Sequence, residues 1–310
     1  MKILFIGFGS IAKKHLWALN EIIKDPEIYA IRSTKNSPEI AGVKSIYQMS
    51  EIPNDIHFAI ISNPTSAHAG TLLLLSQIGC PVFIEKPLFN EINESNRLLT
   101  QQVKMLGIKT YVACNLRFHP MMIAFNNLIK TASGKVEEVN VYCGSYLPNW
   151  RPGKNYKEVY SSNRAMGGGV DLDLIHEVDY VTWFFGFPNR TIALKSSASN
   201  IDIQAPDAAY YLLQYDKFVV NIGLNYFRRQ SKRTFEVVMS DQTFMLDLVG
   251  NKIYREGEVV INGSEQDLMT SYLEQMKYFI GCIDTGLRVE NDIENAYKVL
   301  EICLADEIEK

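Results

Sequence analysis

The sequence lacks the features of membrane-spanning, disulfide-bonded and nucleic-acid-binding proteins. No apolar run approaches the ~20 residues that a membrane helix needs, and residues 72–75 form one of the longest such runs. The five cysteines are widely spaced and contain no C-x-x-C pair, which argues against a disulfide framework or a structural zinc site. The net charge is -4, so the basic footprint of a nucleic-acid-binding protein is missing.

What is present is an ordinary globular composition. The 310 residues are 47% hydrophobic and 21% charged, which excludes disordered and low-complexity classes and suggests about two domains. The apolar residues 3–6 are interrupted at Gly7, which argues against a signal peptide. We therefore expect a cytoplasmic protein without a membrane or nucleic-acid partner.

The first third of the chain alternates strand-like and helix-like segments, which predicts βαβ units and a parallel sheet. After residue 118, closely spaced strands predict hairpins. We predict an α/β fold with an N-terminal Rossmann domain, a doubly wound parallel sheet, in residues 1–117. A C-terminal α+β domain with a large, mostly antiparallel sheet follows in residues 118–291, and a helix at 292–309 is expected to return to the first domain. Further helices are expected at 170–185 and 266–284, and the active site between the domains.

A glycine-rich turn follows the first expected strand and opens the first helix. It reads Gly7-Phe8-Gly9-Ser10-Ile11-Ala12, or G-x-G-x-x-A. The first glycine allows a tight turn, the second lets the backbone approach a pyrophosphate, and the small sixth residue permits close packing. The free N–H groups of the helix then face the phosphates. A plain strand–helix turn, a flavin site and an adenosyl-methionine site are the alternatives.

The second expected strand ends without the acidic residue that would hold the ribose of NAD. Arg32 and Ser33 follow it instead, and they could hold the 2′-phosphate of NADP. The cofactor is therefore NADP or NAD, with NADP favoured. A solvated basic turn is the alternative.

Lys86 lies where ligands bind in open α/β sheets, beyond the carboxyl end of the strand at 82–84. It could donate a hydrogen bond to a substrate oxygen, although most lysines are simply exposed. Ser62, Asn63 and Pro64 follow a neighbouring strand at the same edge. Four motifs in this order make the chain resemble the glucose–fructose oxidoreductase / inositol dehydrogenase / rhizopine-catabolism (Gfo/Idh/MocA) family: Gly7 to Ala12 with His15, Asn63-Pro64-Thr65 with His68, Glu85-Lys86-Pro87, and Asn115-Leu116-Arg117-Phe118.

The resemblance implies NAD(P)-dependent chemistry on sugars or cyclitols, and a second domain that often oligomerises through its open sheet face. It implies a catalytic or substrate-positioning Lys86 and a cis bond before Pro87. Further cofactor contacts are expected from Ser62, Asn63, Pro64, His68, Glu85 and Asn115.

A second candidate cluster follows Gly167-Gly168-Gly169. Asp173, His176 and Asp179 are three residues apart and would share one helix face. Imidazole suits a base for a sugar hydroxyl near neutral pH, so His176 is the predicted acid/base, with Asp173 orienting it. An ordinary amphipathic helix is the alternative. We predict no metal, since no further ligand is evident.

In many family members an Asp precedes this His by four residues, whereas Leu172 stands there in this chain. The sequence resembles a subgroup associated with surface-polysaccharide or nonulosonic-acid sugars, which points to an acidic or nucleotide-linked sugar. Arginines suit anions, and aromatic rings could stack on a sugar or pack at a domain interface. The predicted substrate contacts are Arg117, Trp150, Arg151, Tyr156, Tyr160 and Arg164.

The sequence thus predicts an NAD(P)-dependent oxidoreductase that acts on a CH–OH group of a sugar-like or cyclitol substrate, and a homo-oligomer. Two alternatives stay open. One is a non-catalytic, dinucleotide-binding sensor or regulator. The other is an NAD-dependent hydrolase with a transient keto intermediate.

Overall fold

The computed structural model describes residues 1–32, 34 and 36–305, and it divides into two compact units. The first comprises Met1–Asn115 and Tyr272–Lys298, and the second comprises Leu116–Ser271 and the segment that begins at Val299. Residues 272–291, which the sequence assigned to the second domain, join the first unit. Ser33, a predicted cofactor contact, lies outside the described residues.

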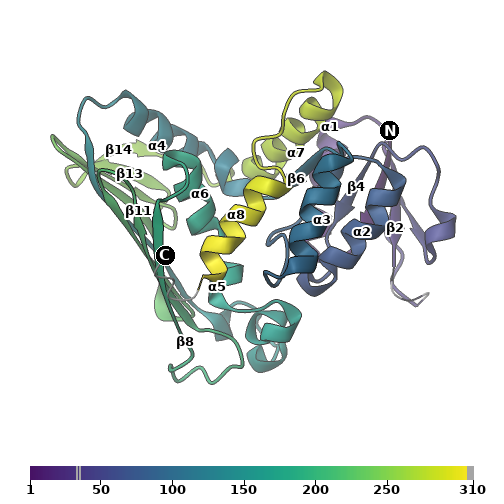
Figure 1. Ribbon diagram of the computed structural model, residues 1–310, viewed down its shortest axis with the longest axis horizontal. Helices are drawn as coiled ribbons and strands as arrows, with labels where there is room; N and C mark the ends of the chain where they lie inside the picture. Colours follow the sequence, from purple (N-terminus) through teal and green to yellow (C-terminus); the bar gives the residue numbers. More distant parts are fainter. Residues whose placement is uncertain (33, 35, 306–310) are drawn as a thin grey trace. The chain divides into compact units, whose positions relative to one another are not determined.

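The first unit contains a parallel sheet in the order β3-β2-β1-β4-β5-β6 (Figure 1). Its strands are β1 (Lys2–Ile6), β2 (Glu27–Ile31), β3 (Val43–Ile46), β4 (Phe58–Ile61), β5 (Val82–Ile84) and β6 (Thr110–Val112). Its helices include α1 (Ser10–Ile22), α2 (His68–Ile78) and α3 (Glu94–Met105). Every residue of β4 and β5 is buried, as expected for inner strands of a parallel sheet. This strand order is that of a Rossmann domain, which confirms the predicted fold class.

Most of helix α7 (Asp267–Thr285) belongs to the first unit, although it follows the strands of the second unit in sequence. Phe279 is fully buried, and its ring lies 5.4 Å from that of Phe58 and 5.6 Å from that of Phe83. Phe58 and Phe83 belong to β4 and β5. The apolar side of these strands is therefore completed by residues far downstream in the sequence.

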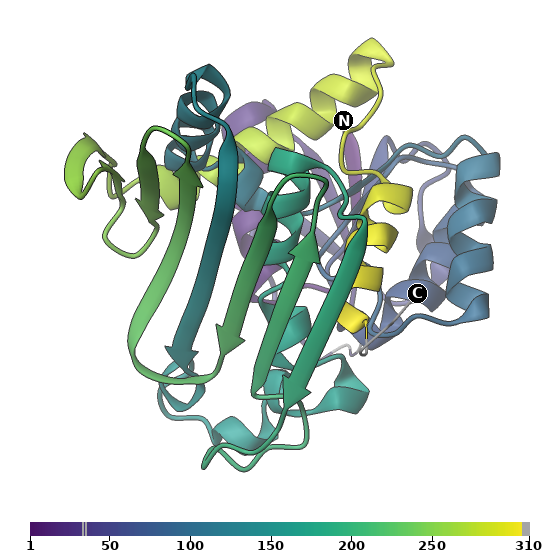
Figure 2. The same ribbon diagram turned by 60° about the vertical axis from the view of Figure 1, so that its left-hand side comes forward.

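The second unit contains an eight-stranded sheet in the order β14-β13-β12-β11-β7-β10-β9-β8 (Figure 2). Only β7 and β10 pair in parallel. The strands are β7 (Val136–Tyr146), β8 (Arg190–Ser196), β9 (Ala208–Gln214), β10 (Val219–Asn225), β11 (Phe227–Met239), β12 (Thr243–Asp247), β13 (Lys252–Arg255) and β14 (Glu258–Asn262). The mostly antiparallel sheet predicted from the sequence is confirmed.

One face of this sheet packs against helices. The helices of the unit include α4 (Pro120–Thr131), α5 (Val170–Asp173), α6 (His176–Phe185) and the end of α8 (Ile293–Leu304). Rings of Phe125 on α4 and of Tyr180 and Phe184 on α6 lie within 5.1 Å of the ring of Phe235 on β11. Aromatic burial on this scale anchors the helices to the sheet.

Three features of the second unit differ from the sequence prediction. The helix α4 and the strands β13 and β14 were not expected. The single helix predicted at 170–185 is two, because Leu174 and Ile175 leave the helix between α5 and α6. Asp173 and His176 therefore do not share one continuous helix face. Among the helices in the described part of the chain, none is long and apolar enough to span a membrane.

Candidate active site

The glycine turn lies at the point where the strand order of the first sheet reverses. β1 pairs with β2 on one side and with β4 on the other, and ligands of open α/β sheets bind at such a switch point. Gly7 has φ +85°, and a Cβ there would lie 2.7 Å from the backbone N and Cα of Asn63. Only glycine therefore fits at this position.

The start of α1 suits the pyrophosphate of a dinucleotide. Its N-cap is Gly9, so no side chain caps the first N–H groups, and no acidic residue lies in the first turn. A Cβ on Gly9 would meet no atom within 4 Å, so the space beside this backbone is open. Uncapped N–H groups and the positive end of the helix dipole favour an anion here.

Arg32 directly follows β2, and the structure places it beside the glycine turn. Its guanidinium carbon lies 5.9 Å from the centre of the Phe8 ring, and Nη1 donates to the Pro38 carbonyl oxygen at 3.4 Å. A long cationic side chain beside the turn fits either a 2′-phosphate or an adenine ring.

The segment after β4 is fixed by a buried histidine. His68 places Nε2 3.1 Å from the Asn63 carbonyl oxygen and Nδ1 3.1 Å from that of Pro87. Burial lowers the pKa of His68, although the neighbouring carbonyls and Glu85 oppose this shift. Ser62 donates to the Gly7 carbonyl oxygen at 2.9 Å, which joins the ends of β1 and β4. Direct cofactor contacts by these side chains and by the exposed Pro64 stay predictions.

Lys86 follows β5 in a segment that is held from several sides. The Lys86–Pro87 peptide is cis, as the family resemblance implied. The carboxylate of Glu85 lies 2.5 Å from the buried His15 imidazole and accepts the Lys86 backbone N–H at 3.2 Å. Lys86 itself is half-buried. Asn115 is buried at the start of a 3-10 turn that ends at Phe118.

In the second unit, Asp173 accepts hydrogen bonds from two tyrosines. The Tyr226 hydroxyl donates to Oδ2 at 2.6 Å, and the Tyr160 hydroxyl donates to Oδ1. Tyr226 is fully buried, and burial raises its pKa well above the usual value. The two phenol hydroxyls thus fix the orientation of the Asp173 carboxylate just before α6.

The glycine run makes room for the protein's own atoms rather than for a ligand. A Cβ on Gly168 would lie 2.1 Å from the Tyr160 carbonyl oxygen, and one on Gly169 would lie 2.6 Å from Oδ1 of Asp171. Arg164 bonds this same Oδ1 at 2.9 Å. Burial raises the pKa of Asp171, against the effect of the Arg164 charge. The guanidinium of Arg164 thus has a structural partner, and its predicted contact with a substrate stays a prediction.

Arg117 forms a buried ion pair with Asp179. It is 6% exposed, and its Nε and Nη2 donate to both oxygens of Asp179 at 2.9 and 2.7 Å. A bidentate pair of this kind uses the fork that would recognise a carboxylate or phosphate. The guanidinium of Arg117 therefore forms a buried ion pair, and its predicted contact with a substrate stays a prediction.

The remaining predicted site residues differ in exposure. His176 opens α6 and is partly exposed, and Arg151 is exposed. Trp150 is exposed, donates Nε1–H to Ser145 at 2.9 Å, and stands edge-on to the Tyr226 ring at 5.2 Å. Tyr156 donates to the Ile201 carbonyl oxygen at 3.0 Å, so its hydroxyl holds a loop.

Two family models match this chain. Residues 1–109 match the oxidoreductase family with an NAD-binding Rossmann fold, and residues 128–245 match the C-terminal domain of the Gfo/Idh/MocA family. This chain belongs to the Gfo/Idh/MocA oxidoreductase family. The Rossmann unit described above is thus an NAD-binding fold. In the described part of the chain, no three His, Cys, Asp or Glu side chains are grouped to hold a metal ion.

Several relatives of this chain share about a quarter of its residues or fewer. Two Bacillus subtilis proteins, YteT and the uncharacterized oxidoreductase YrbE, are 26% and 23% identical over 52% and 62% of this chain; the chain spans only 38% and 56% of their lengths. Inositol 2-dehydrogenase of Corynebacterium glutamicum is 21% identical over 93% of this chain and 87% of its own. The crystal structure of the WlbA dehydrogenase from Bordetella pertussis, in complex with NADH and UDP-GlcNAcA, is 16% identical with a TM-score of 0.83, covering 97% of this chain and 93% of that one.

Two pairings in these clusters cannot be predicted from the sequence, although Asp179 itself was a candidate residue. Tyr226 lies 53 residues from Asp173, and Asp179 lies 62 residues from Arg117. No local spacing connects residues so far apart. The only sequence signal was the aromatic and basic stretch that begins at Tyr226, which gives no partner by itself.

Proposed function

We propose that this Gfo/Idh/MocA protein is an NAD(P)-dependent dehydrogenase that oxidises or reduces a CH–OH carbon of a sugar-like or cyclitol substrate. The observation that carries the proposal is Lys86, which lies beyond the carboxyl end of β5 with its backbone N–H bonded to Glu85, in the sheet that carries the dinucleotide turn. The relatives that support the substrate class are the inositol 2-dehydrogenase and WlbA with its bound UDP-GlcNAcA. An acidic or nucleotide-linked sugar is the narrower candidate.

The proposed roles follow from the chemistry of each side chain. Nicotinamide supplies the hydride acceptor or donor when it is bound. In oxidation, His176 takes the hydroxyl proton on a ring nitrogen, and Lys86 donates a hydrogen bond to the same oxygen as negative charge develops. In reduction, His176 returns the proton. Asp173, held by its two tyrosines just before α6, is the residue we assign to orient His176.

The test is turnover of a panel of cyclitols and UDP-sugars with either cofactor, in the wild type and in two variants. Lys86→Met should abolish turnover while cofactor affinity stays within a few-fold. His176→Asn should lower turnover roughly 10²–10⁴-fold and flatten the rise of oxidation rate with pH. An active Lys86→Met protein would remove Lys86 from the mechanism. Cofactor binding without turnover of any substrate would favour a regulator, and a product formed without net cofactor consumption would favour the hydrolase.

We also propose a preference for NADP, with Arg32 as the main contact. An acidic residue that would repel a 2′-phosphate is missing after β2, and Arg32 takes that place beside the glycine turn. Ser33 is the second predicted contact. NADPH and NADH titrations of wild type and Arg32→Ala should show tighter NADPH binding that only the variant loses. Tighter NADH binding, unchanged in Arg32→Ala, would overturn the preference.

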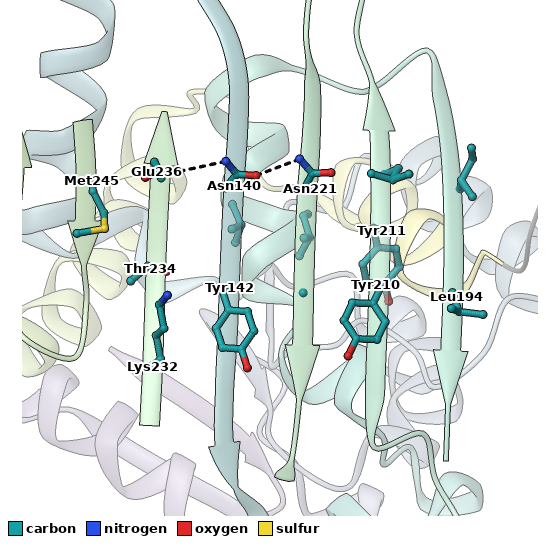
Figure 3. A pocket seen from close by; sticks show the side chains of 15 residues that line it. Asn140, Tyr142, Leu194, Tyr210, Tyr211, Asn221, Lys232, Thr234, Glu236 and Met245 are labelled. Carbon is teal, nitrogen blue, oxygen red and sulfur yellow. Dashed lines mark hydrogen bonds between the residues drawn. The ribbon is translucent and has the colours of Figure 1, made fainter. Parts of the chain in front are cut away.

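We further propose that the chain forms a homo-oligomer through the open face of the eight-stranded sheet. Figure 3 shows a hollow on this face, with Tyr142 and Tyr210 on either side of Gly223. Leu194 and Leu212 are among its exposed apolar side chains. Asn140 bonds Glu236 at one end of the hollow, and the cation of Lys232 lies near Tyr142 at the other. Exposed apolar groups with opposite charges at the two ends suit a second, antiparallel copy.

Light scattering of Leu212→Arg tests this interface. Leu212 is 45% exposed on β9, and Leu73 is 44% exposed on α2, so Leu73→Arg is a matched control. Leu212→Arg should lower the oligomeric mass at equal concentration, whereas Leu73→Arg should leave it unchanged. A monomeric wild type, or an oligomer that survives Leu212→Arg, would contradict the proposal.

A further inference from the structure

The imidazole of His15 is completely buried inside the Rossmann unit and contacts one carboxylate. Its exposed fraction is 0%, and Nε2 lies 2.5 Å from Oε1 of Glu85. The Phe83 ring lies edge-on at 4.9 Å, and the Tyr272 ring lies at 6.2 Å. An ionised carboxylate can only accept, so Nε2–H is the donor. Packed between two rings, the imidazole has little freedom to leave this position.

The same carboxylate holds the peptide that carries Lys86. Oε2 of Glu85 accepts the Lys86 backbone N–H at 3.2 Å, and the Glu85 backbone N–H donates to the Ile61 carbonyl oxygen at 2.9 Å. One oxygen of Glu85 is thus bound by helix α1, and the other by the peptide just beyond β5. The contact joins the helix behind the glycine turn to the segment of Lys86.

We propose that His15 is a positioning residue for Lys86 and acts through Glu85. The proposal rests on the role given to Lys86 under the proposed function. His15 cannot touch a substrate, because it is buried and its donor faces Glu85. Without that donor, the buried carboxylate must turn toward water or another partner, and the Lys86 peptide loses its fixed acceptor. A displacement of ~1 Å at a reacting group can lower a rate by ~10²-fold.

The kinetic test separates positioning from cofactor binding. His15→Leu removes the donor at similar size, and His15→Gln retains an amide donor. Lys14→Met is the control, because Lys14 is also on α1 and, among the described residues, its hydrogen bond and its ring contact are both with Tyr272. We expect kcat to fall by about 10- to 100-fold in His15→Leu, with NADH affinity within a few-fold, substantial recovery in His15→Gln, and wild-type values in Lys14→Met. Equal kcat in His15→Leu and wild type would overturn the proposal.

A second readout needs no turnover and no cofactor. After reductive methylation with a ¹³C label, the Lys86 signal is identified by its absence in Lys86→Met. We expect this signal to move toward that of an exposed lysine in His15→Leu and to keep its wild-type position in His15→Gln. Glu85→Gln should cause the same change as His15→Leu, and it replaces that variant if His15→Leu does not fold. An unchanged Lys86 signal in these variants would overturn the inference, whereas absent turnover in the wild type would overturn only the proposed function.

Discussion

At the scale of single residues, buried polar side chains hold the two candidate clusters in place. In the first unit, the His68 ring bonds the carbonyl oxygens of Asn63 and Pro87. In the second unit, the Asp173 carboxylate accepts hydrogen bonds from two tyrosine hydroxyls. Buried polar groups cost free energy unless they are paired. Removing one partner should therefore affect stability and the geometry of the neighbouring predicted catalytic groups together.

Tyr226→Phe tests the hydrogen bond from Tyr226 to Asp173. Loss of this donor leaves a buried carboxylate with one phenol fewer, and we expect the free energy of unfolding to fall by about 1–3 kcal/mol. The carboxylate of Asp173 is also held less firmly beside α6, so kcat should fall together with stability. Urea unfolding and steady-state kinetics measure the two effects.

The control is Tyr215→Phe. The Tyr215 hydroxyl donates to a neutral carbonyl, that of Gly186, at 2.8 Å. Tyr215→Phe should lower stability without changing kcat. Equal kcat in Tyr226→Phe and wild type would contradict the role of Tyr226.

His68 predicts how stability depends on pH. Its pKa is lowered by burial from the ordinary 6.5, so below this value the unfolded chain binds more protons than the folded one. The contribution of His68 to the free energy of unfolding is therefore complete above pH 6.5. It is lost as the pH falls from there toward the lower pKa of His68 in the folded state. Urea unfolding across this range should show a weaker pH dependence in His68→Gln than in wild type. If stability depends on pH equally in His68→Gln and in wild type, the effect belongs to another group. One such group is His119, whose pKa is also lowered by burial.

At the scale of elements, the junction between β1 and α1 is the most constrained segment of the Rossmann unit. The positive φ of Gly7 and its approach to Asn63 leave no room for a side chain. In the second unit, the break between α5 and α6 follows a glycine run that packs against its own preceding turn. Both segments depend on backbone contacts that a single methyl group disturbs.

Gly7→Ala tests the first of these contacts. A methyl group 2.7 Å from the Asn63 backbone, at a positive φ, must displace the turn. We expect NADH binding to be lost and the free energy of unfolding to fall by at least ~1 kcal/mol. Gly70→Ala is the control, because Gly70 lies within α2 and its Cβ would meet no atom within 4 Å. Gly70→Ala should raise stability by roughly 0.5–1 kcal/mol. Unchanged NADH affinity in Gly7→Ala would contradict the assignment of the glycine turn to cofactor binding.

At the scale of the whole molecule, the chain builds its first unit from two separate parts. Residues 272–298 complete a sheet whose strands all lie before residue 115. The Asn291 amide donates to the Val112 carbonyl oxygen at 2.7 Å, so the returning segment also bonds β6. The Rossmann unit therefore depends on sequence that follows almost all of the second unit.

Phe279→Ala tests that dependence. Phe279 is fully buried against rings of β4 and β5, so its truncation should cost about 3–5 kcal/mol of stability and weaken NADH binding. Leu268→Ala on the same helix is the control, because Leu268 is 47% exposed, and it should change stability by less than ~0.5 kcal/mol. Equal unfolding midpoints for the two variants would show that the returning helix adds little to the Rossmann unit.

The sequence by itself determined the local features of this protein. The glycine turn, the buried strands beside it and Lys86 beyond β5 follow from spacing within a few residues, because turn geometry and strand periodicity are local properties. The same holds for the two fold classes, since strand–helix alternation and closely spaced strands predict different sheets.

The contacts between distant side chains depend on the fold. The sequence predicts that Arg117 contacts a substrate anion. In the fold, Arg117 and Asp179 form a buried ion pair. Asp173 accepts a hydrogen bond from Tyr226. Phe58 on β4 packs against the ring of Phe279, which lies more than 200 residues downstream. Such contacts depend on the path of the whole chain, because a side chain's partner is set by which elements pack together and not by its neighbours in sequence.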